Sequence, residues 1–157
     1  MKLSLAVAML LALSRAAPPE PVTWSLALDP APGTFRIGGA LTAVVTARLE
    51  QGWHVYGVDD LPGGPRPLRV VVPPNGAFAA RGALKCPEPE RDMDEAFSQV
   101  TMLYRDNFTC RQAVTAAPGA VPGRQTLAVE ISFQACDGRM CLPPRIVRLT
   151  KAVTLTR

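Results

Sequence analysis

Short runs of apolar and β-branched residues, separated by turn sequences, recur along the whole chain. In the clearest run, apolar side chains occupy every second position: Leu127, Val129, Ile131 and Phe133. This period of two is typical of a strand with one buried face. Similar runs predict strands over residues 22–28, 40–49, 68–72, 101–104, 108–114, 125–133 and 146–155.

Turn sequences rich in proline and glycine separate these runs, and the chain has 16 Pro and 12 Gly. No segment of ten or more residues carries the apolar stripe of an amphipathic helix. Several short strands with regularly spaced turns predict an all-β antiparallel sandwich. Neither an internal repeat nor a linker divides the sequence, so we expect one domain.

The first residues have the pattern of a secretory signal. Met1 and Lys2 give a positive start, residues 3–13 are an uncharged apolar run, and small residues follow. We expect a signal peptide over residues 1–16 and a mature domain over 17–157, exported to the periplasm or beyond. The alternative is an uncleaved core strand or a membrane anchor. The mature part has no second apolar stretch of membrane-spanning length.

Charge does not favour a polyanionic partner. Of the 17 basic residues, Lys2 and Arg15 lie in the leader, which leaves 15 against 13 acidic residues. The basic residues are scattered, so we expect no nucleic-acid partner. Four cysteines in an exported chain predict disulfides or disulfide exchange. A four-cysteine zinc site is the weaker alternative, because only one pair is closely spaced.

The close pair is Cys136 and Cys141. It follows a predicted strand, has Gly138 at its bend and is followed by two prolines, 143–144. Four intervening residues let the two Cα atoms approach within the ~4.4–6.8 Å that a disulfide needs. Closing so small a ring removes less chain entropy than closing a long loop. The spacing fits both a structural disulfide and a reversible one.

The remaining candidates have weaker patterns. Cys86 and Cys110 are 24 residues apart, which suits a structural disulfide or two buried thiols. His54 is the only histidine, and we interpret it as a sheet residue rather than a catalytic base for a cysteine. The acidic stretch over 88–95 is predicted to be a solvated loop.

The residues around the close pair resemble the active-site segment of the N-terminal periplasmic domain of the thiol:disulfide interchange protein DsbD. Both have an aromatic residue, Gln, a small residue and Cys (133–136 here), then Cys and two prolines (141–144). Gly-Trp-His-Val-Tyr at 52–56 and Glu-Ala-Phe-Ser at 95–98 are similar to two further stretches of that family, in the same order. Leu142 replaces an aromatic residue, and the second cysteine pair has no counterpart.

The resemblance implies an immunoglobulin-like β-sandwich with the close pair at one edge. It also implies that Cys141 exchanges disulfides with partner proteins and that Cys136 resolves the mixed disulfide. Phe97 would be a lid over the sulfurs, and the carboxylate of Glu95 would lie near them in a cap loop.

We therefore expect thiol–disulfide interchange, with protein-disulfide reductase activity. Thiolate attack through a mixed disulfide uses no metal and no organic cofactor. The expected partners are thioredoxin-fold proteins, as reductants and as oxidised clients. The alternative function is a non-catalytic immunoglobulin-like binding module with structural disulfides.

Overall fold

The computed structural model describes residues 19–31 and 33–157, and within them the chain forms twelve β-strands. The signal peptide predicted over residues 1–16 lies outside the described residues. In the described part, no helix is long and apolar enough to cross a membrane.

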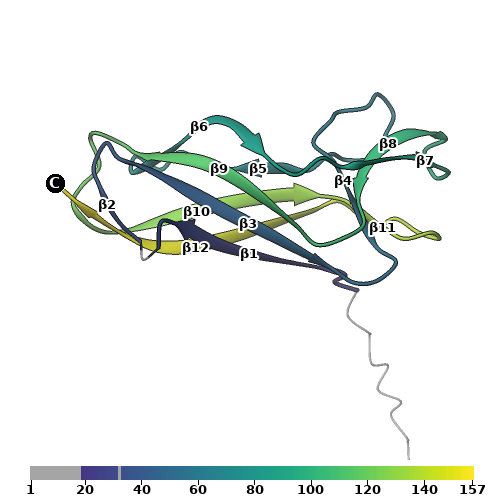
Figure 1. The fold of residues 1–157 in the computed structure, drawn as a ribbon, viewed down its shortest axis with the longest axis horizontal. Coiled ribbons are helices and arrows are strands. Elements are labelled where there is room, and N and C mark those ends of the chain that lie inside the picture. The colour runs from purple at the N-terminus through teal and green to yellow at the C-terminus, as the bar shows by residue number, and fades with distance from the viewer. Residues whose placement is uncertain (1–18, 32) are drawn as a thin grey trace, which may run out of the picture.

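Two four-stranded sheets form the body of a β-sandwich (Figure 1). The first is antiparallel throughout and has the order β1 (Val22–Asp29), β3 (Ala40–Leu49), β9 (Phe108–Ala116), β6 (Phe78–Lys85). The second has the order β2 (Thr34–Arg36), β12 (Arg145–Thr156), β10 (Gly123–Phe133), β5 (Arg69–Val71), and only its β2–β12 pair is parallel. The predicted all-β, immunoglobulin-like sandwich is confirmed.

Apolar side chains from both sheets fill the space between them. The four apolar residues that alternate along β10 are all buried: Leu127, Val129, Ile131 and Phe133. Trp24 of β1 packs against Phe108 and Phe133, with ring centroids 5.8 Å and 5.1 Å away. Burial of this apolar surface is the main stabilising contribution to the sandwich.

A third, smaller sheet lies at one end of the sandwich, opposite the C-terminus (Figure 1). Its order is β11 (Ala135–Cys136), β4 (His54–Tyr56), β8 (Gln99–Tyr104), β7 (Glu90–Asp94), and all its pairs are antiparallel. One residue, Gln134, separates β11 from β10. The third sheet therefore continues from the sandwich. It contains Cys136, and Cys141 pairs with Cys136 at its edge.

Each of the seven predicted strands is present, with ends within two residues of those expected. The prediction of a solvated loop over 88–95 is wrong, because Glu90–Asp94 forms β7. This strand pairs with β8 on one side only, and its charged side chains are exposed except for that of Asp94, which is buried. Two of them, Glu90 and Asp92, form ion pairs with Arg105. Charges on an edge strand also discourage pairing with other chains.

Candidate functional site

Cys136 and Cys141 are joined by a disulfide at the β11 edge of the third sheet. Cys136 lies in β11 and pairs with Cys141 across an isolated bridge, with Cα atoms 4.1 Å apart. The two sulfurs differ in environment: Cys136 is 1 % exposed, whereas Cys141 is only partly buried. An approaching thiol therefore meets Cys141 first.

The loop between the cysteines is ordered by its first residue, Asp137. Its Oδ1 accepts hydrogen bonds from the backbone N–H groups of Arg139 and Met140, both at 2.7 Å. These two donors, that of Met140 first, hold the pKa of Asp137 below its usual value. Gly138 has no positive φ, so the turn depends on the Asp137 side chain rather than on glycine.

Gln134 joins the C-terminal end of this loop to the connection between β4 and β5. Its Oε1 accepts a hydrogen bond from the N–H of Arg66 at 3.0 Å, and its Nε2 donates to the carbonyl of Leu142 at 3.3 Å. The N–H of Leu142 donates in turn to the carbonyl of Ala135 at 2.9 Å. The glutamine that precedes Cys136 in the motif is thus needed for these two hydrogen bonds.

Tyr56 forms the floor beneath the disulfide. It is buried in a small cluster with Leu103 and Cys136, and its hydroxyl lies 4.0 Å from Sγ of Cys141. The hydroxyl donates a 2.6 Å hydrogen bond to Oδ2 of Asp94. Burial and this bond raise the pKa of Tyr56 well above its usual value, so the phenol stays protonated at neutral pH.

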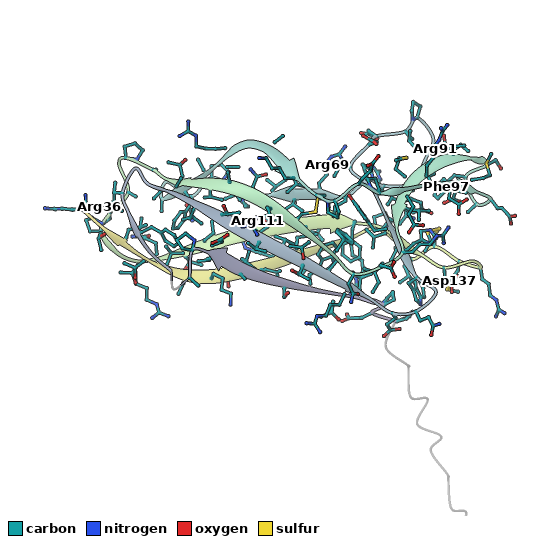
Figure 2. All side chains as sticks on the ribbon, in the orientation of Figure 1. Arg36, Arg69, Arg91, Phe97, Arg111 and Asp137 are labelled. Atoms are coloured by element: carbon teal, nitrogen blue, oxygen red, sulfur yellow. A yellow bond between two sulfur atoms is a disulfide. The ribbon has the colours of Figure 1, made fainter. Side chains whose placement is uncertain are left out.

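Phe97 covers the cluster from the loop between β7 and β8. It packs against Tyr56 edge to face, with ring centroids 5.9 Å apart, and both Phe97 and Cys141 pack against the cluster of Tyr56, Leu103 and Cys136. Figure 2 shows Phe97 and Asp137 at the same end of the molecule. Phe97 and the two cysteines line the same hollow, and the role of Phe97 as a lid over the sulfurs stays a prediction.

Asp94, a residue that the sequence analysis did not select, fixes the position of this loop. Its Oδ1 accepts hydrogen bonds from the N–H groups of Ala96 at 2.9 Å and Phe97 at 3.2 Å, while Oδ2 binds Tyr56. Asp94 is 9 % exposed, whereas the neighbouring Glu95 is exposed at the rim. An aspartate whose side chain accepts hydrogen bonds from N–H groups two and three residues further on is a recognised turn signal, and this signal could have identified Asp94.

His54 lies beside Cys136 as its direct partner in the pairing of β4 with β11. The imidazole is 8 % exposed, and its Nε2 lies 3.3 Å from the hydroxyl of Tyr56. Burial is the main reason that the pKa of His54 is below its usual value. It is thus a buried sheet residue, as predicted, but it also lines the hollow around the disulfide.

That hollow has a volume of about 640 Å³ and an open rim. Two methionines at the rim, Met93 and Met140, are 60 % and 55 % exposed. Methionine adapts its shape to different apolar surfaces, so such a rim suits contact with another protein. In the part of the chain that the structure describes, no group of three or more His, Cys, Asp or Glu is placed to hold a metal ion.

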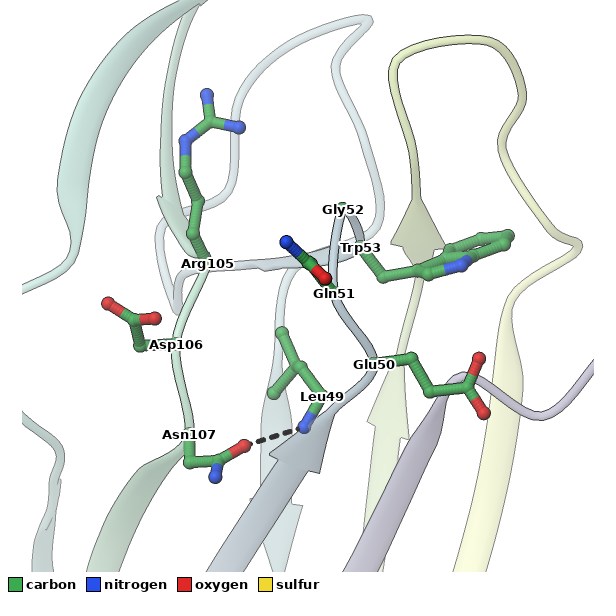
Figure 3. Close-up of a pocket in the computed structure, with 8 residues that line it drawn as sticks. All are labelled: Leu49, Glu50, Gln51, Gly52, Trp53, Arg105, Asp106 and Asn107. Atoms are coloured by element: carbon green, nitrogen blue, oxygen red, sulfur yellow. Dashed lines mark hydrogen bonds between the residues drawn. The ribbon is translucent and has the colours of Figure 1, made fainter.

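A neighbouring groove of about 430 Å³ lies between the β3–β4 and β8–β9 connections (Figure 3). Asn107 accepts a 2.8 Å hydrogen bond from the N–H of Leu49 and so joins the two connections. Arg105 lines both this groove and the hollow around the disulfide. The groove thus adjoins the hollow at Arg105, and no cysteine lines it.

The second cysteine pair, which the sequence left as a bridge or as two thiols, forms a disulfide. Cys110 is fully buried in β9, and Cys86 follows the end of β6, the strand next to β9. Their Cα atoms are 4.2 Å apart. This bond joins neighbouring strands of the first sheet, away from the hollow around Cys136 and Cys141.

Comparison with known proteins gives one match in sequence and several in structure. The sequence profile described as "Thiol:disulfide interchange protein DsbD, N-terminal" matches residues 15–151. A comparison with curated proteins finds no match.

The structural similarities are remote. The N-terminal periplasmic domain of ScsB from Proteus mirabilis has 10% identity and a TM-score of 0.47, over 85% of this chain and 45% of that one. The major pilin subunit BcpA of Bacillus cereus has 11% identity and a TM-score of 0.45, over 85% and 40%. The fimbrial subunit AggA of Escherichia coli has 10% identity and a TM-score of 0.40, over 86% and 95%. The chain spans less than half the length of the first two.

Proposed function

The chain belongs to the family of the N-terminal domain of the thiol:disulfide interchange protein DsbD, and we propose that it passes reducing equivalents between proteins through Cys136 and Cys141. The different exposure of the two sulfurs is the observation that carries this proposal. Attack is directed to Cys141 because Cys136 is 1 % exposed, and a buried partner is well placed to resolve the mixed disulfide.

The proposed reaction moves two electrons in two exchange steps. A partner's thiolate attacks Sγ of Cys141, so that a partner–Cys141 bond forms and the Cys136–Cys141 bond breaks. The electron pair of the broken bond stays on Cys136. The partner's second thiolate then attacks the partner's first sulfur in the mixed disulfide, so that a disulfide forms within the partner, the bond to Cys141 breaks and Cys141 leaves as a thiolate. Transfer to an oxidised client follows the same steps in reverse, with Cys136 as the resolving thiol.

In this proposal the loop containing Glu95 and Phe97 protects the disulfide between encounters. Phe97 contacts the cluster around the two cysteines and shields it from small thiols. A partner that displaces the loop gains access to Cys141. Reactivity then depends on a specific partner surface, which separates protein-to-protein exchange from unwanted reduction.

We further propose that the domain acts in the periplasm and that its partners are thioredoxin-fold proteins. The exposed methionines at the rim, Met93 and Met140, support this by offering an apolar contact surface around the reactive sulfur. Such proteins place their own reactive cysteine on an exposed surface, so the two sulfurs can meet without unfolding.

Trapping experiments test the assignment of the two sulfurs. Reduced Cys136→Ser protein, mixed with an excess of an oxidised thioredoxin-fold protein, should accumulate a mixed disulfide, because the thiol that completes the forward transfer is gone and only the partner's second thiol, in the back reaction, can release it. Cys141→Ser protein is the matched control and should form none. Non-reducing electrophoresis followed by peptide mass spectrometry identifies the linked cysteine.

The redox potential distinguishes this proposal from an inert binding module. Exchange catalysts have potentials of roughly −120 to −270 mV, whereas structural disulfides of exported proteins lie below about −300 mV. Equilibration of the close pair in glutathione buffers should give a value in the first range. A value far below −300 mV, together with no trapped complex from Cys136→Ser, would favour the binding module.

A further inference from the structure

His54 is the one imidazole beside the disulfide, and its position sets it against Cys136 in particular. The two residues are direct partners across the antiparallel β4–β11 pair. Side chains at such positions lie on the same face of the sheet, with Cβ atoms ~4.5–5.5 Å apart. Both also line the hollow around the disulfide. Cys136, the resolving sulfur in the proposed function, thus has a titratable neighbour within a buried environment.

The hydrogen bonds of Tyr56 determine which nitrogen of His54 is available as a base. The phenol donates its single proton to Asp94 at 2.6 Å, so its oxygen accepts from Nε2 of His54 at 3.3 Å. Nε2 therefore carries the proton in the neutral imidazole, and Nδ1 is left with a free lone pair. The network orients the ring and leaves one basic nitrogen.

We propose that His54 is the base that takes the proton from the thiol of Cys136 when this residue resolves a mixed disulfide. The inference rests on the proposed function of the Cys136–Cys141 pair. Cys136–SH gives its proton to Nδ1 of His54, and the resulting thiolate attacks Sγ of Cys141. The Cys136–Cys141 bond forms, the bond from Cys141 to the partner breaks, and the electron pair leaves on the partner's sulfur. The imidazolium then returns its proton to water.

The charges around His54 suit this role. Burial and Arg105 lower the pKa of His54, while the carboxylates of Asp94, Asp137 and Asp92 raise it. The imidazole is therefore neutral and ready to accept a proton at neutral pH. Once the thiolate of Cys136 forms beside it, an opposite charge stabilises the imidazolium. The protonation of His54 is thus coupled to whether Cys136 is a thiolate or part of the disulfide.

A titration of His54 tests the coupling directly, because it is the only histidine of the chain. In untagged Cys141→Ser protein, Cys136 is a free thiol and the second disulfide is intact. We expect the NMR signal of His54 to report an imidazolium that persists about one pH unit or more higher than in Cys136→Ser protein. Cys136→Ser is the matched control, since it frees the other thiol of the same disulfide.

The reciprocal measurement follows the thiolate of Cys136 by its ultraviolet absorbance. Replacing histidine in the Cys141→Ser background, as His54→Gln, should raise the midpoint of thiolate formation by about one pH unit. Equal His54 midpoints in the two serine variants, or a thiolate midpoint that His54→Gln leaves in place, would overturn the proposal. Neither measurement needs a partner protein, so a failure of transfer between proteins is separately recognisable.

Discussion

Replacing Asp94 by alanine should accelerate the reduction of the Cys136–Cys141 disulfide by small thiols by roughly tenfold to a hundredfold. Asp94 holds the loop over the disulfide through three hydrogen bonds, from Tyr56 at 2.6 Å, Ala96 at 2.9 Å and Phe97 at 3.2 Å. Alanine removes both acceptor oxygens, and with them all three hydrogen bonds, while leaving the backbone of the β7–β8 hairpin in place. The loop should then open more often and expose the sulfurs.

The magnitude follows from the charge and burial of this carboxylate. A hydrogen bond to a charged group contributes about 1.5–3 kcal/mol. Asp94 is 9 % exposed, so water replaces the lost bonds poorly in the closed loop. If the closed loop loses the equivalent of one such bond relative to the open loop, the open population rises roughly tenfold to a hundredfold, at about 1.4 kcal/mol per tenfold. Reduction through the open form increases in proportion.

The assay is the rate of reduction by excess dithiothreitol, stopped by alkylation and followed by peptide mass spectrometry. Peptide mapping separates the close pair from the Cys86–Cys110 disulfide. Asp94→Asn keeps an acceptor oxygen for the loop N–H groups and should give a smaller acceleration. Glu88→Ala, an exposed carboxylate ahead of β7, removes the same charge and should leave the rate unchanged.

An unchanged or slower rate in Asp94→Ala protein that still unfolds cooperatively would refute the idea that Asp94 restrains the loop. An equal acceleration in Glu88→Ala would show that net charge, rather than loop closure, controls the rate. Thermal unfolding followed by circular dichroism distinguishes loop opening from loss of the whole domain.

Three further predictions use other contacts of the site and of the sandwich. Because the second disulfide closes a loop with a sequence separation of 24, replacing Cys86 and Cys110 by alanine should lower the free energy of unfolding in urea by about 3 kcal/mol. The lowered pKa of Asp137 means that its ionised form favours the folded loop. This stabilisation is present above the usual pKa of 3.8 and is lost as the pH falls through the lowered value. At pH 7 the stabilisation is present, so its removal in Asp137→Ala protein should make amide exchange at Met140 faster. Gln134→Ala removes two hydrogen bonds and should lower the free energy of unfolding by about 1–2 kcal/mol, as measured in urea.

Several features of this protein could be predicted from local sequence alone. A period of two along strands such as β10 indicates a buried face, because alternate side chains of a strand point to opposite sides of the sheet. Proline and glycine mark where strands end. The close cysteine pair was visible because a disulfide across four residues needs little more than a turn.

Other strands could not be predicted because a neighbouring strand stabilises them. β6 has no apolar alternation and β7 is almost wholly charged. Each forms because a neighbouring strand, β9 or β8, offers backbone hydrogen-bond partners along one edge. Pairing of this kind depends on residues distant in sequence, and no local pattern reports it.

The composition of the candidate site was likewise decided by tertiary structure. The sequence identifies Cys136 and Cys141 and, through a family resemblance, Phe97. It does not indicate that Asp94 rather than Glu95 points inward, or that His54 pairs with Cys136 across two strands. Those relations depend on strand register, which sets which side chains share a face and so which charges come close together. Interactions between residues close in sequence can be predicted from the sequence, whereas interactions between side chains on different strands depend on the register of the folded sheet.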